Sequence, residues 1–452
     1  MRINRRDFLR NSCASALGLV LSQRAAESAL RSQTTPARPP NFLFILTDQQ
    51  RWDAVGASGN KHVDTPNLDR LSREGIRFHN CYTVQAVCSP SRASIISGLY
   101  PHAHGVTDNV YGIDDVTSMP KYRMRTIWPL LLQQAGYRTC YVGKWHLGEK
   151  APKCFDEWHG FNSNLSHWMG EPYESDYRSD VETDTGLAFL KANAKRPFVL
   201  FQSYYPPHTP YTAPKKYWGY YENTSLKPLE YYAACSDIDA NIGRLLAQLE
   251  NLDLLDNTFI IFTSDHGDHF GTRPGGANKR AAYDDCARVP LIIHHPSLAR
   301  GGKVANELVA NVDLMPTILE AAAVAAPKGL HGMSLLPLCA GKKVAWRDAV
   351  IIENTEDVKK QDGEISAACN SRGVRTRDWK LILRDRLSVR ASGLREFYNL
   401  PSDPWEHRDV YGRPHTREIE AILNKLEAWA RSVGDQESLT LAADCRADLG
   451  LT

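Results

Sequence analysis

Residues Cys88–Arg92, which read Cys-Ser-Pro-Ser-Arg, place a nucleophile and a cation at helical spacing. Pro90 suits the first turn of a helix, because the amide that it lacks would have no partner there. We therefore expect a helix running through Ile96, with Cys88 just ahead of its positive end. Arg92 lies about one turn further on, so its guanidinium is expected over Cys88. Unpaired N–H groups and a partial positive charge at this point favour binding of a tetrahedral oxyanion.

Two apolar runs end in residues that can bind a cation. Asn41–Thr47 is followed by Asp48 and Gln49, and the run 258–263 is followed by Ser264, Asp265 and His266. Because the carboxyl ends of parallel strands meet at one edge of a sheet, we expect these ligands to meet as well. For Asp48 and Gln49 considered alone, a polar turn after the strand, capped by Asp48, would be the simpler interpretation.

Other basic side chains follow two further predicted strands. Residues 137–142 lead to Lys144 and His146, which would share one face of an extended segment. Residues 198–203 lead to His208, which flanking prolines hold in a stiff loop. A lone histidine would more simply be structural, but a lysine and a histidine together at the end of a strand favour a functional site.

The motifs together resemble those of the sulfatase family, which belongs to the alkaline phosphatase superfamily. Cys88–Arg92 is similar to its C-x-P-S-R signature, in which a dedicated enzyme oxidises the cysteine to formylglycine. Residues 143–146 resemble its G-K-W-H motif, and His208 matches its P-H-x-P histidine. The lysine that the family carries in a later segment aligns with Lys279 rather than Arg280. A buried cysteine in an ordinary turn is the alternative, and the number of motifs in the expected order disfavours it.

The resemblance implies a mechanism and a role for each matching residue. Formylglycine would hydrate, one hydroxyl would attack sulfur, and deprotonation of the other would expel sulfate. The implied cation ligands are Asp48, Gln49, Cys88, Asp265 and His266. The implied catalytic residues are Cys88, Arg92 and Lys144 at the aldehyde hydrate, His146 as the base that releases sulfate, and His208 and Lys279 at the sulfate and the leaving alcohol.

Two departures from the family pattern leave alternatives open. Gln49 stands where many sulfatases have Asp, and His266 stands where many have Asn. Oxygen ligands still favour Ca²⁺, but a histidine keeps Mn²⁺ and Zn²⁺ open. Related phosphonate monoester hydrolases and phosphodiesterases share similar variants, so hydrolysis of such esters is an alternative activity. An inactive relative that binds glycans is a third hypothesis.

The first 40 residues resemble a twin-arginine signal peptide and linker. Arg5 and Arg6 precede a short, modestly apolar run, so we expect export to the periplasm or secretion by the twin-arginine machinery. A disordered basic tail is the alternative. The net charge of +2 suggests no nucleic-acid partner, and no segment predicts a membrane span. The expected partners are a sulfated small molecule or glycan and the formylglycine-generating maturase.

The chain has ten cysteines, and only Cys88 is assigned to chemistry. Cys13 lies in the expected signal. The other eight show no paired metal-ligand spacing, and disulfides among them stay open.

The expected fold class is α/β, with a large mixed, mostly parallel sheet between helices and a smaller C-terminal antiparallel sheet with a helix. The expected division is 1–40 for the signal, 41–345 for the catalytic domain and 346–452 for the C-terminal subdomain. A strand is expected at 289–293, an irregular insertion at 157–184, and helices at 126–135, 231–249, 313–323 and, last in the chain, 417–430.

Overall fold

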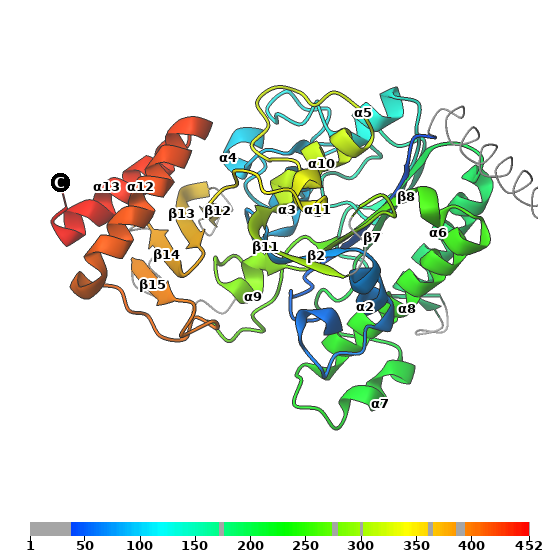
Figure 1. The fold of residues 1–452 in the computed structure, drawn as a ribbon, viewed down its shortest axis with the longest axis horizontal. Helices are drawn as coiled ribbons and strands as arrows, with labels where there is room; N and C mark the ends of the chain where they lie inside the picture. Colours follow the sequence, from blue (N-terminus) through cyan, green and yellow to red (C-terminus); the bar gives the residue numbers. More distant parts are fainter. Residues whose placement is uncertain are drawn as a thin grey trace, which may run out of the picture. The chain divides into compact units, whose positions relative to one another are not determined.

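The computed structural model describes residues 38–170, 176–273, 279–298, 302–359, 365–385 and 394–451, and Figure 1 shows its fold. The expected export signal lies outside these residues. A large sheet forms the centre. Its strands, in order, are β11 (Lys303–Ala310), β2 (Ile76–Tyr82), β10 (Leu291–His294), β8 (Thr258–Ser264), β1 (Asn41–Thr47), β7 (Phe198–Tyr204), β3 (Arg138–Lys144) and β4 (Glu157–Phe161), with β9 (Arg288–Val289) paired to β2.

The sheet is mixed and mostly parallel, as the sequence predicts. From β8 to β4 every neighbouring pair is parallel, and β11 also runs parallel to β2. Within the described part of this sheet, the antiparallel pairs are those that β10 makes with β2 and β8 and that β9 makes with β2. The carboxyl ends of β8, β1, β7 and β3 therefore lie along one edge of the sheet.

Strand β1 is apolar on both sides because each side faces a different core. Phe42 and Phe44 pack with the helices α3 (Cys88–Ser97), α5 (Trp128–Gln134) and α10 (Leu314–Ala321). Leu43 and Ile45 pack with α2 (Pro66–Glu74), α6 (Arg178–Asn193) and α8 (Leu229–Asn251). Figure 1 shows these two groups of helices on opposite faces of the sheet. Burial on both faces is typical of a parallel sheet.

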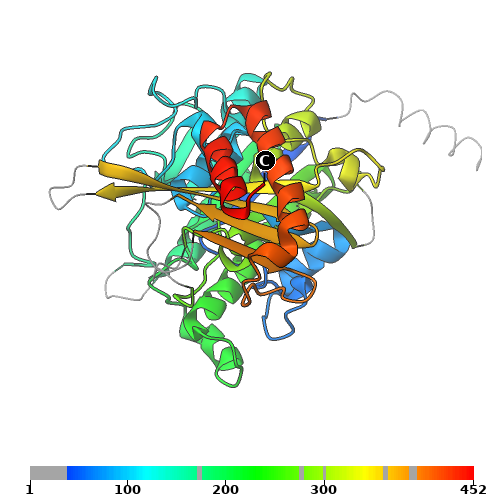
Figure 2. The same ribbon diagram turned by 90° about the vertical axis from the view of Figure 1, so that its left-hand side faces the viewer.

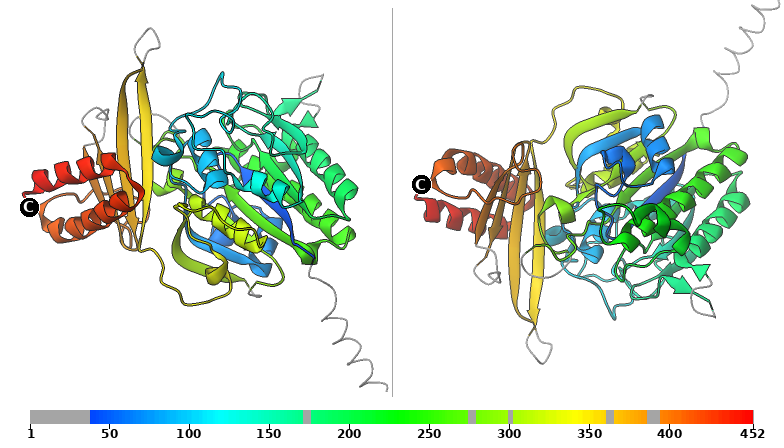
Figure 3. Two further views of the ribbon diagram at one scale, coloured as in Figure 1. Left: turned by 90° about the horizontal axis from the view of Figure 1, so that it is seen from above. Right: turned by 90° about the horizontal axis from the view of Figure 1, so that it is seen from below.

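The C-terminal part is a four-stranded antiparallel sheet covered by two helices. Its strands are β12 (Ala349–Lys359), β13 (Ile365–Thr376), β14 (Trp379–Arg384) and β15 (Arg395–Asn399). Figure 2 shows α12 (Thr416–Val433) and α13 (Gln436–Leu449) in front of this sheet, and Figure 3 shows the long β12–β13 hairpin. The expectation that the helix at 417–430 is the last one was wrong, because α13 follows it. The expected boundary at residue 345 stays a prediction.

Shorter elements complete the described chain. They are the helices α4 (Pro101–His104), α7 (Trp218–Tyr221), α9 (Asp284–Ala287) and α11 (Leu336–Cys339), the strands β5 (Trp168–Met169) and β6 (Asp176–Tyr177), and several single 3₁₀ turns. Within the described ranges, no helix combines the length and the apolar character that crossing a bilayer requires.

The expectation of an irregular insertion at 157–184 was wrong. Glu157–Phe161 is β4, which pairs with β3, and α6 begins at Arg178. Neither carries a clear apolar period, since β4 lies at the edge of the sheet and α6 buries polar residues. The expected strand at 289–293 is divided by Pro290 into β9 and β10. Cys88 is the first residue of α3 rather than the residue before it, and Val87 is the N-cap.

A buried ion-pair network links the two sheets next to α9. Lys380 of β14 donates to the carbonyl oxygen of Ala282 at 2.8 Å and to Asp284 Oδ1 at 2.5 Å, and its ammonium also contacts Glu406. Lys380 is fully buried, so losing either carboxylate would leave a charge without compensation. This network fixes the segment that begins at Lys279.

Glu182 on α6 is a buried carboxyl group beside the sheet. Neither of its oxygens has a hydrogen-bond partner among the described residues, and the Arg178 guanidinium lies 3.9 Å away. Burial, opposed only by Arg178, raises the pKa of Glu182 to about 8. The folded chain therefore holds this proton more tightly than the unfolded chain, and stability falls as pH rises from about 4.5 to about 8.

Replacing Glu182 with Gln should therefore raise the free energy of unfolding at pH 9 by on the order of 2 kcal/mol and change it little at pH 5. Urea unfolding at both pH values measures the difference. Asp184→Asn, at an exposed position of the same helix, serves as the control. An equal effect of Glu182→Gln at both pH values would contradict the pKa assignment.

Candidate active site

The ends of β1 and β8 bring two carboxylates together. The strands pair in parallel with Thr47 opposite Ser264, so Asp48 and Asp265 emerge side by side. The backbone N–H of Asp265 donates to the carbonyl oxygen of Thr47 at 3.1 Å, which closes the junction. The backbone N–H of Gln49 donates to Asp265 Oδ1 at 3.0 Å. The neighbouring strand ends thus fix both acids.

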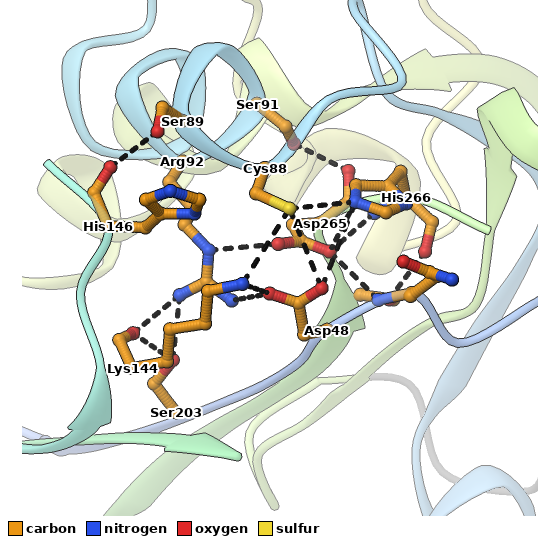
Figure 4. A network of polar contacts seen from close by, with 12 residues as sticks. Asp48, Cys88, Ser89, Ser91, Arg92, Lys144, His146, Ser203, Asp265 and His266 are labelled. Atoms are coloured by element: carbon orange, nitrogen blue, oxygen red, sulfur yellow. Dashed lines mark hydrogen bonds and ion pairs between the residues drawn. The ribbon is translucent and has the colours of Figure 1, made fainter. Parts of the chain in front are cut away.

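Cys88 approaches these carboxylates from the first turn of α3. Its Sγ lies 3.7 Å from Asp48 Oδ1 and 3.2 Å from His266 Nε2 (Figure 4). One ligand atom from each of Asp48, Cys88, Asp265 and His266 lies within 4.8 Å of the others, and all four residues are fully buried. This donor set fits a divalent cation: two hard carboxylates, one imidazole and the side chain of Cys88.

Gln49, the fifth expected ligand, lies beside this cluster with both ends of its amide engaged. Its Nε2 donates to Asp268 Oδ2 at 2.5 Å, and its Oε1 accepts from Lys279 Nζ at 3.3 Å. The residue adopts the left-handed conformation, with φ of 70°. Asp268 is fully buried and was not assigned a role from the sequence, although it lies only three residues after Asp265.

Arg92 bridges the ends of neighbouring strands. Its Nε donates to Asp265 Oδ2 at 2.8 Å and its Nη2 donates to Asp48 Oδ2 at 3.0 Å. Its Nη1 donates to the carbonyl oxygen of Lys144 at 2.5 Å and to Ser203 Oγ at 2.9 Å. Burial opposes the charge of Arg92, but the two carboxylates raise its pKa. Cys88 is also close enough to raise this pKa, although no hydrogen bond joins the guanidinium to the thiol among the described residues. Sequence reasoning missed Ser203, which carries no motif.

Two ammonium groups surround the thiol. Lys144 Nζ lies 3.7 Å from Cys88 Sγ and 2.6 Å from Asp48 Oδ2, while Lys279 Nζ lies 3.0 Å from the same sulfur. Burial would raise the pKa of the Cys88 thiol, but the two lysines outweigh it and hold this pKa well below its ordinary value. The environment therefore stabilises negative charge at this position.

The two acids respond in opposite directions to their shared burial. Burial and the charge of Asp48 raise the pKa of Asp265 to about 6. Burial and the charge of Cys88 would raise the pKa of Asp48 as well. The positive charges nearby outweigh them and lower this pKa; they belong to Lys144, His208 and Arg92. Asp48 is therefore the carboxylate whose charge the basic residues hold.

Two histidines reach the cluster from the loops that follow β3 and β7. His146 was expected on an extended segment with Lys144, and this was wrong, because the chain turns into the left-handed conformation at His146, with φ of 57°. Its ring nitrogens have no hydrogen-bond partner among the described residues, and burial lowers its pKa to about 4. His208 Nε2 lies 3.1 Å from Lys279 Nζ and 4.0 Å from Asp48 Oδ1, and burial lowers the pKa of His208.

The alignment of Lys279, rather than Arg280, with the family lysine agrees with where the two side chains lie. Lys279 contacts Cys88, whereas Arg280 Nη2 donates to Asp108 Oδ1 at 2.6 Å. Seven of the cysteines that the structure describes form no disulfide: Cys81, Cys88, Cys140, Cys154, Cys235, Cys339 and Cys445. The structure thus brings every predicted site residue to one cluster around Cys88.

Comparison with known proteins identifies the family. Residues 40–324 match the family model Sulfatase, and residues 275–431 match the model described as N-sulphoglucosamine sulphohydrolase, C-terminal. An N-acetylglucosamine-6-O-sulfatase of Bacteroides thetaiotaomicron is 30% identical, over 91% of this chain and 88% of the relative. An ulvan-active sulfatase of Formosa agariphila is 28% identical, over 90% of this chain and 83% of the relative.

Solved structures share the fold. One, described as a complex with its substrate D-glucosamine-2-N,6-O-disulfate, has a TM-score of 0.75 and 26% identity, and the match covers 89% of this chain and 99% of that chain. A phosphonate monoester hydrolase of Agrobacterium radiobacter has a TM-score of 0.74 at 19% identity, over 87% and 96% of the two chains, which shows the fold alone. The family match and the 30% identity show that the chain belongs to the sulfatase family of the alkaline phosphatase superfamily and is a sulfuric ester hydrolase.

Proposed function

We propose that this sulfatase hydrolyses sulfate esters of carbohydrates through a formylglycine made from Cys88. The observation that carries this proposal is the position of the Cys88 side chain, which lies between Lys279, Lys144 and the two carboxylates at the start of α3. The substrate class is supported by the similar N-acetylglucosamine-6-O-sulfatase and ulvan-active sulfatase, and by the solved structure with a disulfated glucosamine.

The aldehyde and the cation would supply chemistry that the twenty ordinary side chains lack. A hydrated formylglycine would offer one hydroxyl to attack sulfur and a second whose deprotonation releases sulfate, and a divalent cation held by the residues named next would make the first hydroxyl more acidic. We assign the cation to Asp48, Gln49, Asp265, His266 and the modified Cys88. The oxygen-rich set favours Ca²⁺, and the imidazole leaves Mn²⁺ and Zn²⁺ as candidates.

Lys279 and His208 would act on the sulfate group and the departing alcohol. Their terminal nitrogens lie 3.1 Å apart, and Lys279 Nζ lies 3.0 Å from Cys88 Sγ, where the modified side chain would carry oxygen. An ammonium beside an imidazole can stabilise the charge that develops on the sulfate oxygens and donate a proton to the leaving oxygen. The lowered pKa of His208 makes its proton easier to release.

His146, Arg92 and Lys144 would act on the modified residue itself. The pKa of His146, lowered to about 4, leaves its imidazole neutral and able to take the proton whose loss releases sulfate. Lys144 lies against both Cys88 and Asp48, and Arg92 holds the carbonyl oxygen of Lys144. Together they would orient the hydrate and stabilise its negative charge.

Hydrolysis of phosphonate monoesters or phosphodiesters is the second candidate. It is favoured by the presence of Gln49 and His266, which reduce the number of carboxylates and resemble the variants in that branch of the superfamily. We further propose export to the periplasm or secretion through the twin-arginine machinery, after a maturase has modified Cys88.

The first test of the proposal is the mass of the peptide that contains Cys88. Protein made together with a maturase should show a loss of about 18 Da at this residue, because CH₂–SH becomes CHO, and should release the phenol from an aryl sulfate faster than from a matched aryl phosphodiester. Cys88→Ala should show neither. Full turnover by unmodified Cys88, or a preference for the phosphodiester, would contradict the proposed function.

Neighbouring basic residues provide a matched pair for the role of Lys279. Lys279→Met should lower kcat/KM about 100- to 1000-fold, because the sulfate loses its ammonium partner, whereas Arg280→Met should lower it less than about threefold. Steady-state kinetics on an aryl sulfate measures both. Equal losses in the two variants would remove Lys279 from the mechanism.

The cation assignment predicts that ligand loss weakens metal binding itself. After treatment with EDTA, titration of Ca²⁺, Mn²⁺ or Zn²⁺ should raise the melting temperature of the wild-type protein, because ligand binding stabilises the folded state. Asp265→Asn should weaken the apparent affinity at least about tenfold, and Glu320→Gln, at an exposed position of α10, should not. Unchanged metal affinity in Asp265→Asn would show that the cation binds elsewhere.

A further inference from the structure

A basic groove lies at the far end of α3 from Cys88. It has a cavity volume of about 680 Å³ and lies between the loop that follows α4, residues 327–331 and the last residue of α12. Ser97 and Leu99 at the C-terminal end of α3 line it, whereas Cys88 begins that helix. Nine residues at 1.5 Å each separate the two helix ends, so the groove lies ~14 Å from the thiol.

Three cations line the groove without an acidic partner. Arg123, Arg125 and Lys328 are exposed, and none of them makes an ion pair within the part of the chain that the structure describes. Among the described residues that line the groove there is no Asp or Glu. Other cations at the surface, such as Arg70 and Arg244, do pair with carboxylates. The concentration of unpaired positive charge in a hollow favours a polyanion.

The groove also offers a neutral donor and apolar walls. The backbone N–H of Tyr100 donates to His331 Nδ1 at 3.1 Å, which places the proton of the neutral ring on Nε2 and makes that nitrogen a donor. Burial lowers the pKa of His331 to about 4, so the ring is neutral. Tyr122 and Pro327 supply apolar surface between the cations. Cations, a neutral donor and apolar surface are the groups that bind a sulfated sugar, through its anions, its hydroxyls and its C–H faces.

We propose that this groove, lined by Arg123, Arg125 and Lys328, is a second binding site that holds sulfated polysaccharide away from the catalytic cluster. The choice of a carbohydrate rests on the proposed function. A nucleic acid is disfavoured, because the net charge of the chain is only +2 and the cations lie within a hollow rather than along an extended face. Holding a polymer here raises the effective concentration of its sulfate esters near Cys88.

The test measures binding of fluorescent dextran sulfate to protein that carries Cys88→Ala, so that the result does not depend on turnover. R123Q/R125Q/K328Q should weaken binding at least about tenfold at low salt. The matched control is K61Q/K191Q/R417Q, which removes three exposed cations outside the groove and should weaken binding less than about twofold. Equal losses in the two triple variants would overturn the proposal, and so would dextran sulfate binding that added salt does not weaken.

Two further measurements complete the test. In active protein, R123Q/R125Q/K328Q should raise KM for a sulfated polysaccharide several-fold and leave kcat/KM for a small aryl sulfate unchanged.

Binding of an RNA oligonucleotide tests the choice of a carbohydrate. RNA that binds as tightly as dextran sulfate, and loses binding equally in R123Q/R125Q/K328Q, would overturn the carbohydrate assignment. Retained groove binding without any sulfate release would instead refute the proposed function alone. The single variant Lys328→Glu should also weaken binding, and it tests the proposal if the triple variant fails to fold.

Discussion

The guanidinium of Arg92 is the interaction on which the rest of the site depends. It contacts Asp265 after β8, Asp48 after β1, Ser203 on β7 and the carbonyl oxygen of Lys144 at the end of β3. These four strands are consecutive in the sheet, so one side chain from α3 ties the helix to all of them. Without it, two fully buried carboxylates would lose a charged partner, and the helix start that carries Cys88 would lose contacts that hold it to the sheet.

The arrangement balances charge among side chains that are mostly buried. Arg92, Lys144 and Lys279 surround Asp48, Asp265 and the thiol, so opposite charges are nearly equal in number. Such a cluster tolerates burial only because each charge has a partner. The cluster therefore places carboxylates, which could hold a cation, directly beside ammonium groups, which could hold an anion.

The sequence predicted the parts of this site where an apolar run ends in polar residues. Both faces of β1 and β8 are buried, so each strand is a continuous apolar run in the sequence, and Asp48 and Asp265 follow these runs directly. β4 and α6 were missed, since an edge strand with a mixed pattern and a helix with a buried Glu182 lack the expected period. Asp268 and Ser203 were missed for another reason. Their roles come from partners more than a hundred residues away, and local spacing carries no sign of them.

The full burial of Cys88 has a consequence for the order of events during synthesis. Lys279, which lies against the sulfur, is 191 residues further along the chain, and a ribosome adding about 5 to 20 residues per second needs about 10 to 40 s to reach it. Until then the β8 edge and the loop after it do not exist, and the thiol has no cover. If a maturase modifies Cys88 as proposed, translation speed would set the time during which it could reach the thiol, and codon usage between these two positions would control that time.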